Sequence, residues 1–169
     1  MNKLDKLLDL AKQENIFIYF VADIPNYEAD ALFVARNGSR VILILKHLQN
    51  NVSRLTEILA EELGHYFTST GENILPVNYF DRLKIGKCEN KALKWACDFL
   101  IPTNDLIDSF LRNFYTDSID LIAEDLNVSR DILIQKLYFL SLKNDFLKLN
   151  GNKYIVLSNF PSIYPFEKI

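Results

Sequence analysis

The segment LTEILAEELGHYF, residues 55–67, has the pattern of an amphipathic helix with a charged group inside its apolar face. Projected at about 100° per residue, the apolar side chains fall together: Leu55, Ile58, Leu59, Leu63 and Tyr66. Glu62 falls near the middle of this face. Because an unpaired carboxylate among apolar groups is costly, we expect Glu62 to be paired, to lie near a cation, or to belong to a functional site.

His65 lies one helical turn beyond Glu61, at the edge of the same face. Side chains four residues apart on a helix can converge on one ion, so Glu61, Glu62 and His65 form a polar cluster where a core is expected. Taken alone, His65 favours a structural role, as a histidine hydrogen-bonded at the edge of a core. The neighbouring glutamates, and Gly64, which permits close backbone approach, favour a metal site instead.

A second helix with a misplaced carboxylate is predicted over ENKALKWACDFLI, residues 89–101. Its apolar stripe has helical spacing: Ala92, Trp95, Ala96, Phe99 and Leu100. Glu89 projects into this stripe, whereas Asp98 shares the opposite face with two lysines, as on a solvated surface. We therefore prefer Glu89 to Asp98 as a site residue. The regular spacing favours Trp95 and Phe99 as core residues over a substrate platform.

A helix and a small sheet are expected before this pair of helices. Apolar spacing predicts the helix over residues 3–13. Runs of β-forming residues predict strands over residues 16–21, 31–36 and 39–45. Between the last two strands, Asn37 and Gly38 tolerate the positive φ of a type I′ turn, which predicts a hairpin. Residues 71–87 mix Gly, Pro and Asn with aromatic residues and predict a long loop.

The C-terminal region has a different pattern. Thr103 is expected to cap a helix, and two short helices are predicted over residues 118–127 and 129–143 with a tight connection. A second hairpin is predicted around Gly151, which completes the outline of a winged helix. The sequence thus predicts two regions, residues 1–102 and residues 103–169.

Composition limits the class of protein. The 169 residues carry a net charge of -3, which argues against a protein held to nucleic acid by bulk charge. Only Cys88 and Cys97 occur, too few for a disulfide framework, so reduced thiols and a cytoplasmic location are expected. Acidic residues interrupt the N-terminal segment where a signal peptide needs an apolar run, and no segment approaches the length of a membrane span.

The C-terminal region is a poor candidate for a DNA-binding module. Its acidic side chains outnumber its basic ones, and the segment in the position of a recognition helix has only Arg130 and Lys136 against Asp131. Protein docking or completion of the core is favoured over DNA contact. A regulator that does bind DNA through this region would lose affinity on replacement of Arg130 and Lys136.

The segment Glu61-Glu62-Leu63-Gly64-His65 is one substitution away from H-E-x-x-H, in which two histidines hold zinc and the glutamate activates water. With ENKALKWACDFLIP downstream, it resembles the ImmA/IrrE family of metallopeptidases, which occur with phage-type repressors and integrative elements. The motifs are LA-x-E-L-G-H and E-x-x-A-x-x-[FW]-A-x-x-L-[LI]-P, and the resemblance covers residues 1–102.

The resemblance implies an α+β fold with a zincin-like core, made of an N-terminal helix, a small sheet with a hairpin and the H-E-x-x-H-type helix, followed by a winged-helix-like region. It implies that Glu61, His65 and Glu89 hold a metal ion and that Glu62 is the catalytic base. It further implies an intracellular endopeptidase whose protein substrate is a repressor of a phage or mobile element.

The chain departs from the common motif at Glu61, which replaces a histidine, a form associated with phage-type members. Two carboxylates and one imidazole would neutralise most of a divalent ion's charge and make its bound water less acidic. Oxygen-rich ligation also shifts the preference from Zn towards Mn or Fe, although Zn remains the default. An inactive protein that binds and sequesters a regulator is therefore the alternative.

Overall fold

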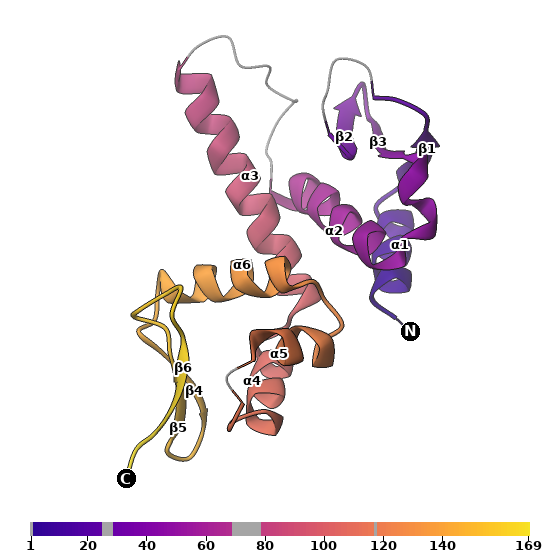
Figure 1. Cartoon of the computed structure of the whole chain (residues 1–169). Coiled ribbons are helices and arrows are strands. Elements are labelled where there is room, and N and C mark those ends of the chain that lie inside the picture. Colours follow the sequence, from indigo (N-terminus) through magenta and orange to yellow (C-terminus); the bar gives the residue numbers. More distant parts are fainter. Residues whose placement is uncertain (1, 25–28, 69–78, 117) are drawn as a thin grey trace. The chain divides into compact units, whose positions relative to one another are not determined.

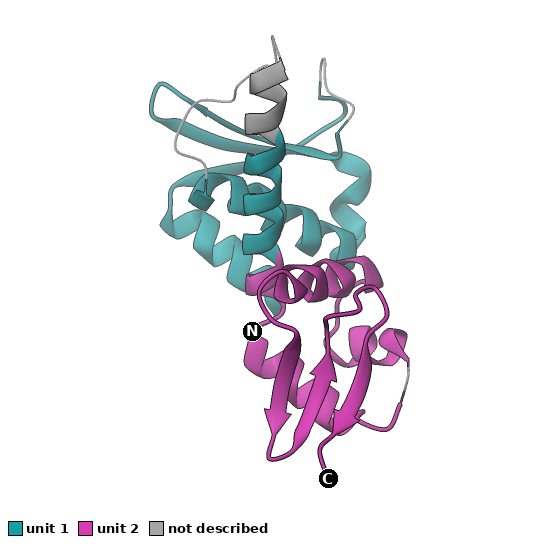
Figure 2. Ribbon diagram, turned by 90° about the vertical axis from the view of Figure 1, so that its left-hand side faces the viewer, with its two compact units in different colours: residues 1–96 teal, residues 97–169 magenta. Residues whose placement is uncertain are grey.

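The computed structural model describes residues 2–24, 29–68, 79–116 and 118–169, with backbone alone over residues 79–85 (Figure 1). The chain is a mixed α+β protein. It divides into two compact units, residues 1–96 and residues 97–169, and the boundary lies within helix α3 (Figure 2). No helix among the described residues is both long and apolar enough to cross a membrane.

The first unit begins with the predicted helix and strands. The elements are α1 (Lys3–Gln13), β1 (Ile16–Val21), β2 (Ala31–Arg36) and β3 (Ser39–Leu45). Asn2 caps α1, because its side-chain oxygen accepts a hydrogen bond from the Asp5 backbone N–H at 2.8 Å. Asn37 and Gly38 have φ values of 51° and 79°, which confirms the predicted hairpin turn.

Strand β3 is the centre of a three-stranded sheet. It pairs in parallel with β1 and antiparallel with β2, so the order is β1-β3-β2. Ile42 and Ile44 of β3 are completely buried, as are Leu59 and Leu63 of helix α2 (Val52–Thr68), which packs against β2 and α1. One face of the sheet is therefore covered by helices.

The two long helices differ in how well their starts were predicted. The short 3-10 helix η1 (Lys46–Asn50) leads into α2, whose start is capped by the Asn51 side chain, which accepts a hydrogen bond from the Arg54 backbone N–H at 3.1 Å. Helix α3 (Tyr79–Leu100) begins ten residues before the predicted start, so residues 79–87 are helical and the predicted loop is wrong there. Residues 71–78 of that loop lie outside the described residues. Gly86 lies within this helix, and a helix can contain a single glycine at a modest cost.

The second unit holds the C-terminal helices and a second sheet. Its elements are α4 (Thr103–Arg112), α5 (Ile119–Asp125), α6 (Arg130–Ser141), β4 (Phe146–Asn150), β5 (Lys153–Val156) and β6 (Tyr164–Glu167). Thr103 is the first residue of α4 and Pro102 occupies the cap position, so the predicted cap is off by one residue. The antiparallel sheet has the order β4-β5-β6. Strand β6 was not predicted, because Pro165 within it argues against a strand.

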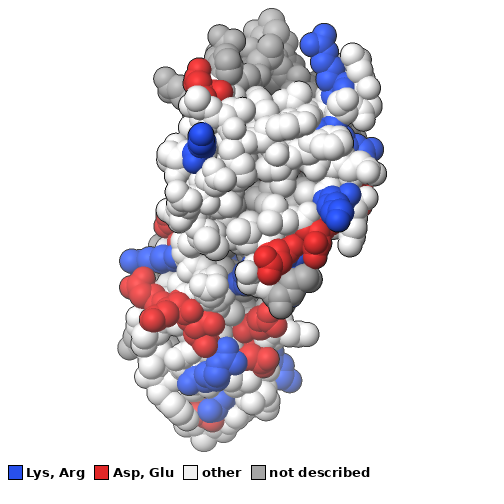
Figure 3. All heavy atoms as spheres, turned by 90° about the vertical axis from the view of Figure 1, so that its right-hand side faces the viewer, with Lys and Arg blue, Asp and Glu red and all other residues white. Residues whose placement is uncertain are grey.

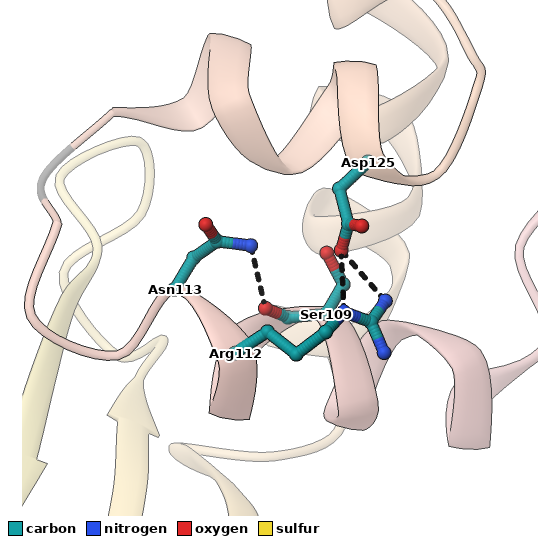
Figure 4. A network of polar contacts seen from close by, with 4 residues as sticks. All are labelled: Ser109, Arg112, Asn113 and Asp125. Carbon is teal, nitrogen blue, oxygen red and sulfur yellow. Dashed lines mark hydrogen bonds and ion pairs between the residues drawn. The ribbon is translucent and has the colours of Figure 1, made fainter.

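A polar network joins α4 to α5 (Figure 4). The Arg112 guanidinium donates to the Asp125 carboxylate at 2.7 and 3.2 Å, and the Asn113 amide donates to the Ser109 carbonyl at 3.0 Å. The hydrogen bond from Arg112 is the main cause that lowers the pKa of Asp125. Arg112 is thereby engaged within its own unit. Cys88 and Cys97 are both free thiols, as predicted.

A buried ion pair between α6 and α3 corrects the prediction that Asp98 lies on a solvated face. Lys136 is 2% exposed, and its ammonium donates to the Asp98 carboxylate at 2.7 Å and to the Thr103 hydroxyl at 3.5 Å. Asp98 is 46% exposed, yet it supplies the counter-charge of a buried lysine and does not belong to a purely solvated face. Because its ammonium is buried, Lys136 cannot contact DNA phosphates. Arg130, the other candidate, lies 3.7 Å from Asp120.

Replacing Asp98 should destabilise the protein more than replacing Lys136. Asp98→Ala leaves a buried ammonium without its counter-charge, and we expect a loss of about 2–3 kcal/mol in the free energy of unfolding. Lys136→Met removes the charge but retains the apolar volume, and we expect a loss below about 1 kcal/mol. Urea denaturation of the full chain measures both. Equal losses in the two variants would contradict a role for Asp98 as counter-charge.

Candidate metal centre

Three of the four predicted site residues meet in the first unit. Glu61, His65 and Glu89 each offer one ligand atom, and these atoms all lie within 4.8 Å of one another. The His65 Nε2 atom is 3.3 Å from the Glu89 Oε2 atom. Glu62 is not part of this group, and its carboxylate accepts a hydrogen bond from the backbone of Phe33 in β2. The structure thus separates three candidate ligands from one candidate base.

The close approach of α2 and α3 brings Glu89 to His65. Gly64 lies directly against the backbone of Ala92, and a Cβ atom at Gly64 would overlap the Ala92 carbonyl oxygen and lie 2.9 Å from its carbonyl carbon. No side chain fits between the two helices at this point. Since His65 follows Gly64 and Glu89 precedes Ala92 by about one turn, this backbone contact sets the spacing of the two candidate ligands.

Aromatic contacts hold the same helices together one turn further along. The rings of Phe67 in α2 and Trp95 in α3 are stacked, with centroids 5.0 Å apart and an angle of 18° between planes. Offset stacking of this kind stabilises beyond simple burial. Trp95 and Phe99 are only half-buried, so the prediction that they belong to the core holds in part.

A second set of contacts holds Tyr66, the residue that follows His65, and none of these contacts was predicted from the sequence. The Tyr66 hydroxyl donates to the Glu14 carboxylate at 2.7 Å, and Arg40 donates to the Glu14 backbone oxygen at 2.9 Å. The Arg40 guanidinium lies 5.0 Å from the Tyr66 ring centroid. The hydrogen bond to Glu14 raises the pKa of Tyr66. Glu14 and Arg40 are each more than 25 residues from Tyr66 and from each other in the chain. Helical periodicity relates residues only a few positions apart, so it could not predict these contacts.

The four ionisable groups differ in their electrostatic environment. Burial raises the pKa of Glu62 to about 7, although His65 and the Phe33 backbone lower it. Burial also raises the pKa of Glu61. Burial lowers the pKa of His65, but the hydrogen bond with Glu89 and the surrounding carboxylates outweigh it and leave the pKa raised. The hydrogen bond from His65 lowers the pKa of Glu89. Glu89 is therefore an anionic ligand candidate, and Glu62 is suited to gain and lose a proton near neutral pH.

The three candidate ligands fit a divalent metal. Two protein atoms at about 2.0–2.1 Å from a tetrahedral zinc ion lie about 3.3 Å apart, which is the separation of the His65 and Glu89 ligand atoms. One imidazole nitrogen and two carboxylate oxygens are a donor set that Zn, Mn and Fe accept. The His65 and Glu89 side chains also form an ion pair with each other.

A mixed α+β fold with an E-E-x-x-H helix and a third carboxylate from a neighbouring helix resembles the arrangement of metallopeptidases. The family model for the IrrE N-terminal-like domain, Peptidase M78, matches residues 14–138. The chain therefore belongs to this family, which confirms the resemblance noted from its sequence motifs. No curated protein and no solved structure gives a significant match to the chain.

Proposed function

We propose that the chain is a metal-dependent endopeptidase in which Glu61, His65 and Glu89 hold the ion and Glu62 is the general base. The observation that carries this proposal is the convergence of three ligand atoms within 4.8 Å on two packed helices. Zinc is the default ion, and the second carboxylate makes Mn or Fe acceptable alternatives. In this proposal residues 1–102 form a zincin-like peptidase domain and residues 103–169 a winged-helix-like region.

Each site residue has a distinct task in the proposed reaction. A divalent ion in this position supplies Lewis acidity, which polarises a peptide carbonyl and makes water a better nucleophile. Glu62 takes a proton from the attacking water and returns it to the leaving amine. Burial raises its pKa to about 7, and a bound cation would lower it towards the ionised form that accepts a proton. The contact between Gly64 and Ala92 holds Glu89 in reach of the same ion as His65.

The proposed substrate is a partner transcription regulator, such as the repressor of a phage or mobile element, cleaved in the cytoplasm. The resemblance of the sequence motifs to the ImmA/IrrE family supports this choice of substrate. Direct DNA binding has no place in the proposal. The net negative charge and the burial of the Lys136 ammonium both argue against it.

A second candidate function is a catalytically inactive protein that binds and sequesters a regulator. The specific observation in its favour is Glu61, whose carboxylate stands where the common motif has an imidazole. A second carboxylate among the three ligands reduces the net charge of the ion and makes its bound water less acidic. The two functions differ in whether peptide bonds are cleaved, which the Glu62 variant described in the Discussion tests.

Metal content tests the centre itself. We expect about one equivalent of metal in the purified chain, and little in His65→Ala and Glu89→Ala, by elemental analysis of protein prepared without added metal. His47→Ala is the matched control, since His47 is the other histidine of the chain and is exposed in η1. A parent protein that holds no metal even after Zn and Mn are offered would exclude the hydrolase.

A further inference from the structure

The sheet of the first unit is apolar on both faces. Side chains alternate across a sheet, and one set, which includes Phe33, Ile42 and Ile44, is buried against the helices. Strand pairing places the other set together on the opposite face: Phe17, Tyr19, Val21, Leu32, Val34, Val41, Leu43 and Leu45. We call this second set the outer sheet face.

The outer sheet face is accessible. Phe17 is 59% exposed and Tyr19 is 53% exposed, and the other six side chains are partly exposed. Arg36, at the end of β2, is the one charged strand residue on this face. Figure 3, viewed from the side on which β1 lies in Figure 1, shows a broad upper area without charged side chains. Sheets with one solvated face normally alternate apolar and polar residues, so an apolar second face indicates an interaction surface.

The dimensions of this face limit what can cover it. Three strands of six residues span about 14 Å by about 20 Å, or about 280 Å². A stable dimer buries about 800 Å² on each partner, so the face is too small to hold two copies of the chain together by itself. A single helix of about 13 residues is about 20 Å long and matches the length of the strands.

The described helices of this chain already use their apolar sides. The side chains that line those sides are buried in α1, α4 and α6: Leu7, Ala11, Leu106, Phe110, Leu133 and Leu137. Nucleic acid and anionic lipid headgroups are bound through several basic residues, and the strands offer only Arg36 on this face. A partner protein is therefore the occupant that the composition of the face favours.

We propose that the outer sheet face docks the apolar side of one amphipathic helix from a partner protein. A helix layer already covers the inner face of the same sheet. A helix docked on the outer sheet face would give helices on both faces, which is a common α/β arrangement. Phe33, whose backbone contacts Glu62, points to the inner face, so the docked helix leaves the candidate metal centre open. The proposal does not depend on peptidase activity.

A model helix tests this proposal on the full chain. The probe is a fluorescently labelled 14-residue peptide with leucines along one helical side and Lys and Glu elsewhere, compared with a scrambled peptide of identical composition. We expect saturable binding by fluorescence anisotropy, at least about tenfold tighter for the amphipathic peptide. The double substitution Phe17→Lys and Tyr19→Lys should weaken binding by about tenfold or more while metal content and thermal unfolding stay unchanged.

Val52→Lys is the matched control, because Val52 is also 59% exposed in the first unit but lies at the start of α2. Should the double variant fail to fold, Phe17→Ser replaces it. Equal affinity for the two peptides, or unchanged binding in the variants, would overturn the proposal. If the chain self-associates and Tyr19→Lys abolishes this association, the face binds a second copy of the chain. If the chain binds uncharged phosphatidylcholine vesicles as strongly as the amphipathic peptide, the face binds lipid. Both results would overturn the partner helix.

Discussion

Glu62→Gln is expected to lower peptide cleavage by about 10² to 10⁴, the range that a positioned general base contributes. The amide keeps the size of the side chain and its place in the apolar face of α2, but it cannot accept a proton from water. Since Glu62 lies outside the group of three candidate ligands, the variant should keep its metal. Loss of turnover with retained metal is the signature of the proposed base.

The measurement uses the full chain loaded with Zn or Mn and a mixture of unstructured peptides, with cleavage read by mass spectrometry. Glu57→Gln is the matched control, because Glu57 is another glutamate of α2, is buried, and lies about one turn before the site. We expect cleavage by this control to match that of the parent. If Glu62→Gln cleaves as fast as the parent, Glu62 is not the base. Metal binding without any cleavage by the parent would instead favour the sequestering protein.

Gly64→Ala should damage both stability and metal binding. The added Cβ atom would meet backbone atoms of Ala92, which cannot rotate away as the end of a flexible side chain can. Helices α2 and α3 have to separate, at a cost of about 1–3 kcal/mol in the free energy of unfolding. Because the same contact sets the distance between His65 and Glu89, we also expect metal affinity to fall by about tenfold or more.

Gly86→Ala provides the control for a glycine of α3 with no neighbour within 4 Å of the added atom. Alanine is a better helix former than glycine, so this variant should gain up to about 1 kcal/mol. Thermal unfolding of the metal-free proteins measures the stability change, and competition with a chromogenic chelator measures metal affinity. Parent-like unfolding and affinity in Gly64→Ala would show that the helices tolerate the extra atom.

Local patterns in the sequence were sufficient for much of the first unit. The strands, the hairpin turn at Asn37-Gly38 and helix α1 depend on periodicity and on the conformational preference of single residues, which neighbouring positions encode. Glu61, Glu62 and His65 follow from spacing within one helix. The prediction of Glu89 needed two further observations, its place in a second apolar stripe and the family resemblance. In the structure its Oε2 atom lies 3.3 Å from the His65 Nε2 atom.

Contacts between distant segments were decided only by the tertiary structure. Asp98 was assigned to a solvated face because helical projection describes one helix at a time, whereas its partner Lys136 comes from another helix 38 residues later. The network of Glu14, Arg40 and Tyr66 was missed for the same reason.

The sequence alone determined helix α1, the three strands and helix α2 of the first unit, and which residue types could carry metal chemistry, since these depend on neighbours along the chain. It could not determine that the described helices cover one face of an apolar sheet, or that Gly64 rests on the backbone of Ala92. Those features depend on which surfaces meet after folding, and packing between segments far apart in the chain leaves no local periodicity to read.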